Sequence, residues 1–127
     1  MRLLLDTHVA IWVVVDPRKI PQPIRRMMSR PDTEVLVSVV SLWEIAIKSS
    51  RRGNMPFSGE AALHEFEAAG LHFLNVSVEH AVAVGNLAVG HADPFDRLIL
   101  AQALCEGIRL VTHDEALAQH SDIVITW

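Results

Sequence analysis

Apolar and polar positions along the chain fall into two kinds of short block. Continuous apolar runs, such as residues 3–5 and the β-branched segment 34–40, are typical of strands buried on both faces of a sheet. Blocks in which apolar residues recur every three or four positions are typical of amphipathic helices. Because the two kinds alternate, the pattern predicts a three-layer α/β/α fold with a central parallel sheet of four to five strands.

The boundaries of these elements follow from turn and cap residues. Thr7 is a possible N-cap for a helix over residues 9–15, although the β-branched content of that segment leaves a strand as the alternative. Ser41 opens a helix that ends at Gly53, and Ser77 caps an apolar helix that runs to about Leu87. Further helices are predicted over residues 24–30, 59–69 and 115–119, and further strands over residues 71–76, 108–112 and 123–126.

The most informative helix lies between His91 and Gly107. Asp93 stands at the N-cap position, Pro94 suits the first turn, and Gly107 supplies a C-terminal stop. Asp96 then falls in the first turn, beside backbone N–H groups that lack helical partners. Its carboxylate serves either in capping or in catalysis, and this segment alone does not decide between them.

Length and composition point to one domain over residues 1–127. Half of the residues are apolar, which is enough for one hydrophobic core. The apolar run at the start is interrupted by Asp6, so we expect neither a signal peptide nor a membrane span, and we predict a cytoplasmic protein. Cys105 cannot form an internal disulfide because it is the one cysteine, and its place in an apolar pattern predicts a buried, unreactive thiol.

The formal net charge of −4 argues mildly against a polyanionic partner, but the basic residues are unevenly distributed. Between residues 18 and 52 there are eight basic and three acidic residues, a local balance of +5. This segment is either a set of solvated helix faces or a phosphate-binding surface. The candidate phosphate contacts, which become RNA contacts if the partner is RNA, are Lys48, Arg51 and Arg52, together with Arg97, which could instead pair with a neighbouring acid.

Four acids are predicted to meet at one edge of the sheet. Asp6 directly follows the first strand, and Asp114 comes two residues after Thr112 ends a later one. Glu44 and Asp96 each fall in the first turn of a predicted helix. Taken singly, each acid has a structural explanation, such as a capping box of Ser41 with Glu44 or an i,i+4 pair of Glu44 with Lys48. Their joint placement favours a functional site.

Such a site requires a positive charge, because two carboxylates about 4 Å apart repel by roughly 4 kcal/mol at an effective dielectric constant near 20. Carboxylate oxygens suit hard cations, so we predict Mg²⁺ or Mn²⁺ and hydrolysis of a phosphodiester bond by a metal-activated water. His8, His91 and His113 adjoin these acids and raise Zn²⁺ as an alternative, but no HExxH or Cys/His spacing supports it.

Four motifs occur in order along the chain. They are Leu-Leu-Asp-Thr-His at 4–8, Ser-Leu-Trp-Glu-Ile at 41–45, His-Ala-Asp-Pro-Phe-Asp-Arg at 91–97 followed by Ala-Gln-Ala at 101–103, and Leu-Val-Thr-His-Asp at 110–114. This ordered set resembles the PIN-domain family, and more narrowly the VapC-type ribonuclease toxins of bacterial toxin–antitoxin pairs. The resemblance implies an Mg²⁺- or Mn²⁺-dependent endoribonuclease that cuts RNA, forms a homodimer and is inhibited by a small VapB-like antitoxin.

Carried over by position, the resemblance implies that Asp6, Glu44 and Asp96 are metal ligands and that Asp114 completes the set. It also implies that Thr7 or Thr112 orients a ligand or a water through its hydroxyl. Asp93 is either an outer acid or only a helix cap.

Two other readings remain. One is a PIN-like module that binds RNA or protein without turnover. The other is a receiver or phosphatase, whose Asp-x-Asp pattern is absent after the first strand.

Overall fold

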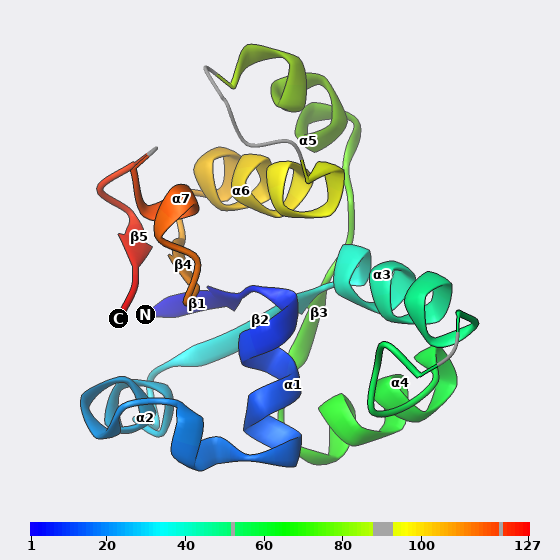
Figure 1. Ribbon diagram of the computed structural model, residues 1–127. Coiled ribbons are helices and arrows are strands. Elements are labelled where there is room, and N and C mark those ends of the chain that lie inside the picture. Colours follow the sequence, from blue (N-terminus) through cyan, green and yellow to red (C-terminus); the bar gives the residue numbers. More distant parts are fainter. Residues whose placement is uncertain (52, 88–92, 120) are drawn as a thin grey trace.

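The computed structural model describes residues 1–51, 53–87, 93–119 and 121–127 (Figure 1). Its five described strands form one sheet in the order β3-β2-β1-β4-β5, and every neighbouring pair is parallel. This confirms the predicted α/β/α architecture. The strands are β1 (Arg2–Leu5), β2 (Glu34–Ser38), β3 (His72–Leu74), β4 (Arg109–Val111) and β5 (Val124–Ile125).

Helices connect the strands and cover both faces of the sheet (Figure 1). No helix in the described ranges is long and apolar enough to cross a membrane. The α-helices are α1 (Thr7–Val15), α2 (Gln22–Met28), α3 (Val39–Ser49), α4 (Gly59–Ala68), α5 (Val78–Ala83), α6 (Pro94–Glu106) and α7 (Glu115–Ala118), and two short 3₁₀ helices are η1 (Pro17–Lys19) and η2 (Val84–Asn86).

The central strand β1 divides the core into two layers. Leu3 and Leu5 point to the face covered by α1, α2 and α4, whereas Leu4 points to the face covered by α6 and α7. Successive side chains of a strand point to opposite faces, so a strand with helices on both sides must be apolar throughout. All three leucines are fully buried, as the continuous apolar run predicted.

The start of α3 differs from the prediction. The strand β2 ends at Ser38, whose hydroxyl accepts a hydrogen bond from the Val40 N–H, so the helix begins at Val39 and not at Ser41. Two β-branched residues in sequence favour a strand, but the cap and the buried contacts of this segment override that preference. The predicted capping box of Ser41 with Glu44 is therefore wrong, and Glu44 lies beyond the first turn of α3.

The start of α1 is also shifted. Residues 7–15 form a helix, which settles the strand alternative, but its N-cap is Asp6 and not Thr7. The Asp6 carboxylate accepts a hydrogen bond from the Val9 N–H, and Thr7 is the first helical residue. Asp6, which was predicted to be a functional residue, therefore also has a structural role as the cap of α1.

The region around α5 is less buried than its sequence predicts. The α-helix stops at Ala83, and of its residues only His80 is buried, whereas Val78 and Val82 are well exposed. Cys105 is exposed as well, because it lies on the α6 face towards the Glu79 carbonyl rather than in the core, so the prediction of a buried thiol is wrong.

Candidate active site

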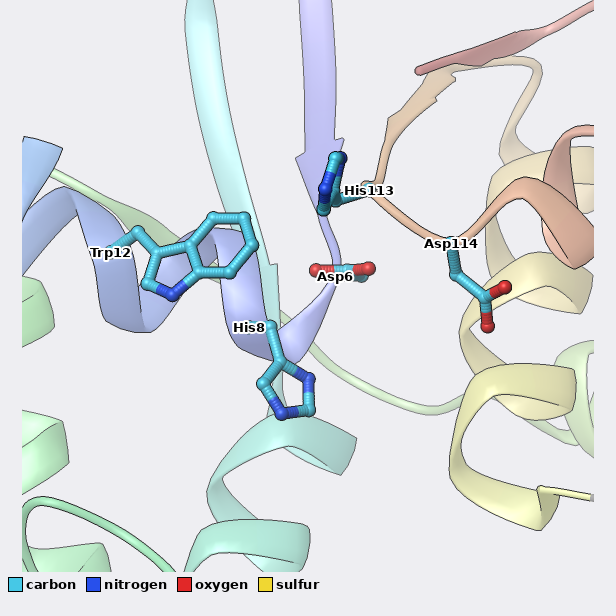
Figure 2. Close-up of a pocket in the computed structure, with 5 residues that line it drawn as sticks. All are labelled: Asp6, His8, Trp12, His113 and Asp114. Atoms are coloured by element: carbon cyan, nitrogen blue, oxygen red, sulfur yellow. The ribbon is translucent and has the colours of Figure 1, made fainter. Parts of the chain in front are cut away.

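Asp6 lies at the carboxyl end of β1, in the middle of the sheet edge where parallel strands place functional residues (Figures 1 and 2). Its side chain is only 6% exposed. Its backbone N–H donates to the Val111 carbonyl at 3.0 Å, and one carboxylate oxygen accepts from the Val9 N–H at 2.8 Å. The Thr112 hydroxyl donates to the other oxygen. Asp6 is thus held in one orientation by β4 and α1.

Burial is the largest influence on Asp6 and raises the pKa of its carboxyl above the ordinary value. The hydrogen bonds from Thr112 and Val9 lower the pKa, and the nearby charge of Glu44 raises it. The effect of Glu44 indicates that the two carboxylates repel each other. Ionised Asp6 is therefore stabilised by any positive charge that enters this region.

Thr112 connects Asp6 with Asp114. Besides donating to Asp6, its fully buried hydroxyl accepts a hydrogen bond from the Asp114 N–H at 3.0 Å. Asp114 caps α7 through a hydrogen bond from the Ala116 N–H at 2.9 Å. Asp6 and Asp114 line one pocket of about 260 Å³, as Figure 2 shows. The predicted meeting of these two acids at one sheet edge is therefore seen.

Glu44 reaches the same region from α3, where its side chain is 2% exposed. One carboxylate oxygen lies 2.5 Å from the Lys48 Nζ, as expected of an i,i+4 pair. The other oxygen, Oε1, is buried and has no hydrogen-bond partner within the described residues. A buried carboxylate oxygen without a partner is costly, and it marks a place where a cation is favoured.

Lys48 lies among the acids of α3 and α6. Burial lowers the pKa of Lys48, whereas the hydrogen bond to Glu44 and the charge of Glu44 raise it. The charges of Asp93 and Asp96 raise the pKa further, so that it lies above the ordinary value for lysine. The ammonium group also lies 5.6 Å from the centre of the Phe95 ring. Lys48 therefore balances the negative charge that three acids bring together.

Asp93 and Asp96 stand at the start of α6, as predicted. Asp93 is the N-cap, and its Oδ1 accepts from the Phe95 N–H at 2.8 Å and from the Asp96 N–H at 3.2 Å. Asp96 follows in the first turn and is half-buried. The positive end of the helix dipole favours a negative charge at both positions.

The acids form two neighbouring groups. Asp6 and Asp114 line the pocket at the ends of β1 and β4, while Glu44, Asp93 and Asp96 interact with Lys48. Across the described part of the chain, no three His, Cys, Asp or Glu side chains lie close enough to hold one metal ion. The effect of Glu44 on Asp6 links the two groups electrostatically.

A family model described as "PIN domain" matches residues 3–123, which is nearly the whole chain. The chain belongs to the PIN-domain family. Among curated proteins, Ribonuclease VapC22 of Mycobacterium tuberculosis is 30% identical over 122 residues, which cover 93% of this chain and 91% of the relative. The sequence therefore places this PIN domain with the VapC ribonucleases.

Solved structures share the PIN-domain fold at low sequence identity. VapBC2 from Rickettsia felis, bound to a DNA fragment from its promoter, superposes with a TM-score of 0.75 at 16% identity, covering 100% of this chain and 99% of the other. A toxin–antitoxin complex from Klebsiella pneumoniae gives a TM-score of 0.64 at 15% identity, covering 98% and 96% of the two chains. At these identities the likeness establishes the fold.

The structure also describes three of the remaining predicted residues, Thr7, Arg51 and Arg97. The Thr7 hydroxyl is buried 2.8 Å from the Ser41 hydroxyl, so it joins α1 to α3. Arg97 donates to the Val84 carbonyl at 3.3 Å, and Arg51 is exposed after α3. Arg52 and His91 lie outside the described residues.

Sequence reasoning gave no role to a buried polar connection that positions α6. The Ser38 hydroxyl donates to Gln102 Oε1 at 2.5 Å, and Gln102 Nε2 donates to the Asn75 carbonyl at 3.3 Å. Gln102 is fully buried and so ties the helix that carries Asp96 to the ends of β2 and β3. A lone glutamine in an otherwise apolar helix pattern was the available signal.

Trp12 is the other residue that sequence reasoning missed. It lines the same pocket as Asp6, together with His8 and His113, which received no role from the sequence (Figure 2). His8 and Trp12 lie four residues apart on α1 and therefore share a helix face. That spacing after Asp6 was the signal in the sequence.

Proposed function

We propose that this VapC-family ribonuclease cuts RNA with the help of Mg²⁺ or Mn²⁺ held by Asp6, Glu44, Asp96 and Asp114. The observation that carries the proposal is the buried Oε1 of Glu44, which has no hydrogen-bond partner within the described ranges. Oxygen donors of this kind suit small, hard cations, and the excess of negative charge around Lys48 favours a cation in the same way. The chemistry of these donors therefore suits a divalent metal, and such an ion would have to draw the two groups of acids closer together, because no three of the described acids lie within reach of one ion in this structure.

When bound, the metal would activate a water molecule and neutralise charge on the phosphate that is attacked. The chain's own residues orient the carboxylates for this purpose. Thr112 fixes Asp6 and the backbone of Asp114, and Gln102 fixes the helix that carries Asp96. We assign Asp93 to capping α6, and Thr7 to holding α1 against α3. Lys48 balances the acids and stands where an RNA phosphate would approach them.

We also propose that the protein is the toxin of a toxin–antitoxin pair, with a small VapB-like antitoxin as its inhibitor and a homodimer as its assembly. A toxin–antitoxin complex and a VapBC complex are among the solved structures that share its fold. The exposed apolar residues of α5 support a protein interface, because Val78 and Val82 lie four residues apart on one helix face and together offer apolar surface to a partner. The proposed place of action is the cytoplasm, where RNA is accessible.

The decisive experiment combines metal binding with RNA cleavage. Thermal unfolding is measured with and without Mg²⁺ or Mn²⁺ for the wild type, for Asp96→Asn and for the matched control Asp122→Asn, which alters an exposed acid outside the proposed ligand set. We expect both metals to raise the Tm of the wild type and of the control but not that of Asp96→Asn. The same proteins are incubated with total bacterial RNA, with and without EDTA.

We expect cleavage by the wild type and by the control, its loss with EDTA, and a decrease of more than about 100-fold for Asp96→Asn and for Asp6→Asn. RNA binding without cleavage and without a metal-dependent rise in Tm would instead establish a module that binds RNA without turnover. Cleavage that persists in EDTA would contradict the metal proposal alone.

A further inference from the structure

Three aromatic rings gather beside the pocket that Asp6 lines. The rings of His113 and Trp127 are stacked, with centroids 4.9 Å apart and planes 26° apart. Trp12 meets both of them, edge to face with His113 at 5.7 Å and tilted against Trp127 at 6.0 Å. The cluster joins α1, the loop after β4 and the segment after β5, none of which are neighbours in sequence.

Two of these rings form the wall of the pocket that contains Asp6. In Figure 2, the indole of Trp12 and the imidazole of His113 lie on different sides of the Asp6 carboxylate, and His8 lies below it. The pocket of about 260 Å³ is smaller than the roughly 300–1,000 Å³ of sites for drug-sized ligands. A pocket of this size accommodates one ring system beside the carboxylates.

The two rings of the pocket wall are only partly covered by the rest of the protein. His113 is exposed although its ring is stacked on Trp127, so part of the ring remains accessible. Trp12 is half-buried and packs against the core with part of its surface. Both rings therefore combine a fixed position with an accessible part, which is the arrangement of a stacking platform.

A positive charge lies over the same indole. The Nζ of Lys19, an exposed residue of η1, lies 5.5 Å from the centre of the Trp12 ring. Sites for single-stranded nucleic acid combine aromatic rings, on which bases stack, with basic groups that follow the phosphates. Here Trp12 supplies the aromatic ring and Lys19 supplies the basic group, and the two side chains are in contact.

Building on the proposed ribonuclease function, we propose that Trp12 and His113 form a subsite for one unpaired base of the RNA, next to the phosphate that is cut. The base stacks on the aromatic wall while Lys19 interacts with a neighbouring phosphate. Because every base has a π-face, the subsite tolerates different sequences. It excludes a base within a duplex, since both faces of such a base are already stacked.

The test measures binding without cleavage. A 5′-fluorescein-labelled single-stranded RNA of ten random nucleotides is titrated in EDTA, and fluorescence anisotropy gives the Kd. The variants are Trp12→Leu, which keeps an apolar side chain without a ring, and Trp12→Phe, which keeps a ring. The matched control is Trp43→Leu, which removes an exposed tryptophan of α3 that lies outside this cluster.

We expect Trp12→Leu to weaken binding by about 5- to 150-fold, which corresponds to about 1–3 kcal/mol for the loss of one stacked base. Trp12→Phe recovers most of the affinity, and Trp43→Leu binds like the wild type. The same RNA annealed to its complement binds the wild type more weakly and is indifferent to the Trp12 substitutions. Melting curves establish that each variant is folded at the temperature of the titration.

The outcomes separate the subsite from the proposed function. If the wild type cleaves RNA but Trp12→Leu binds the single strand with wild-type affinity, the subsite is wrong and the ribonuclease proposal stands. An equal loss in Trp43→Leu, or no recovery in Trp12→Phe, also overturns the subsite, because then no specific ring is responsible. If the wild type neither binds nor cleaves RNA, both proposals fail.

Discussion

Two halves of the candidate site hold their acids by different means. The Asp6 side consists of Asp6, Thr112 and Asp114, and its acids are positioned by hydrogen bonds from buried backbone and hydroxyl groups. The Glu44 side consists of Glu44 and the start of α6, and its charges are balanced by the ammonium group of Lys48. Hydrogen bonds set the directions of the carboxylates on the Asp6 side, whereas charge balance with Lys48 dominates on the Glu44 side.

This difference matters for cation binding. Hydrogen bonds to a carboxylate fix its direction but leave its charge in place, so the Asp6 side presents preoriented oxygens. An ion pair with a flexible lysine offsets charge without fixing a direction, and it leaves one oxygen of Glu44 without a partner in the described structure. A divalent ion therefore meets a rigid half and an adaptable half of one acidic site.

Among residues that position or balance the acids, the largest effect is expected from Thr112→Val on the Asp6 side. The substitution keeps the shape of the side chain but removes the hydroxyl that contacts Asp6 and the Asp114 N–H. We expect RNA cleavage to decrease by about 10- to 100-fold and the free energy of unfolding by about 1–3 kcal/mol. Cleavage rates and chemical denaturation measure the two effects.

Thr126→Val is the matched control, since Thr126 is exposed and lies outside the site. It should change neither quantity. A Thr112→Val protein with full activity would mean that the orientation of Asp6 does not depend on this hydroxyl.

The Glu44 side is tested by Lys48→Met. Without metal, the variant leaves the buried Glu44 carboxylate unpaired, and we expect the free energy of unfolding to fall by about 2 kcal/mol. With saturating Mg²⁺ or Mn²⁺ the difference should narrow, because the cation replaces the ammonium as counter-charge. Denaturation with and without metal measures both values.

The chain has two lysines, so Lys19→Met is the natural control for the loss of one positive charge. The change in the free energy of unfolding caused by Lys19→Met should be the same with and without metal. A destabilisation of Lys48→Met that is equal with and without metal would assign Lys48 to packing rather than to charge balance.

The effect of pH separates burial from hydrogen bonding on the Asp6 side. Burial raises the pKa of Asp6 in the folded protein above its unfolded value, so the folded state binds the proton more tightly. The contribution of Asp6 to stability is therefore complete below the unfolded pKa and is lost as the pH rises through the folded pKa. Asp6→Asn, which can still cap α1, lacks this loss.

We accordingly expect the metal-free wild type to lose stability relative to Asp6→Asn as the pH rises, with a plateau above the folded pKa. Thermal unfolding of both proteins from about pH 4 to about pH 8 measures the difference. A difference that stays constant over this range would mean that burial does not shift the pKa of Asp6.

The smallest effect is expected outside both halves, at Arg51. The slope of log K against the logarithm of the salt concentration is negative for RNA binding. If the exposed guanidinium of Arg51 contacts one RNA phosphate, Arg51→Ala makes this slope shallower by about 0.7. Binding titrations at several salt concentrations measure the slope. An unchanged slope would remove Arg51 from the RNA surface.

Much of the fold was predictable because it depends on local pattern. The run of leucines in β1 predicted a strand buried on both faces, and Asp93, Pro94 and Gly107 bounded α6 correctly. The start of α3 was not predictable in the same way, because Val39 favours a strand, and the Ser38 cap together with tertiary packing places it in a helix.

The site follows the same division. The placement of Asp6 and Asp114 at one edge followed from the parallel topology, which the sequence predicted. The pairing of Lys48 with Glu44 followed from their i,i+4 spacing, but the influence of Asp93 and Asp96 on Lys48 was not predictable, since it depends on how α3 packs against α6. The contact of Trp12 with His113 likewise joins residues about a hundred positions apart, and no local pattern reports such a contact.

The hydrogen bond between Thr112 and Asp6 joins residues 106 positions apart, and it constrains when activity can arise during synthesis. A chain growing at about 5–20 residues per second needs roughly 5–20 s to extend from one of these residues to the other. Until then, β1 lacks its neighbour β4, and the Asp6 carboxylate has no Thr112 to orient it. A protein that cuts RNA therefore lacks its oriented Asp6 while most of its chain is still being synthesised. The ribosome that makes it, which consists largely of RNA, is not exposed to the complete site during that time.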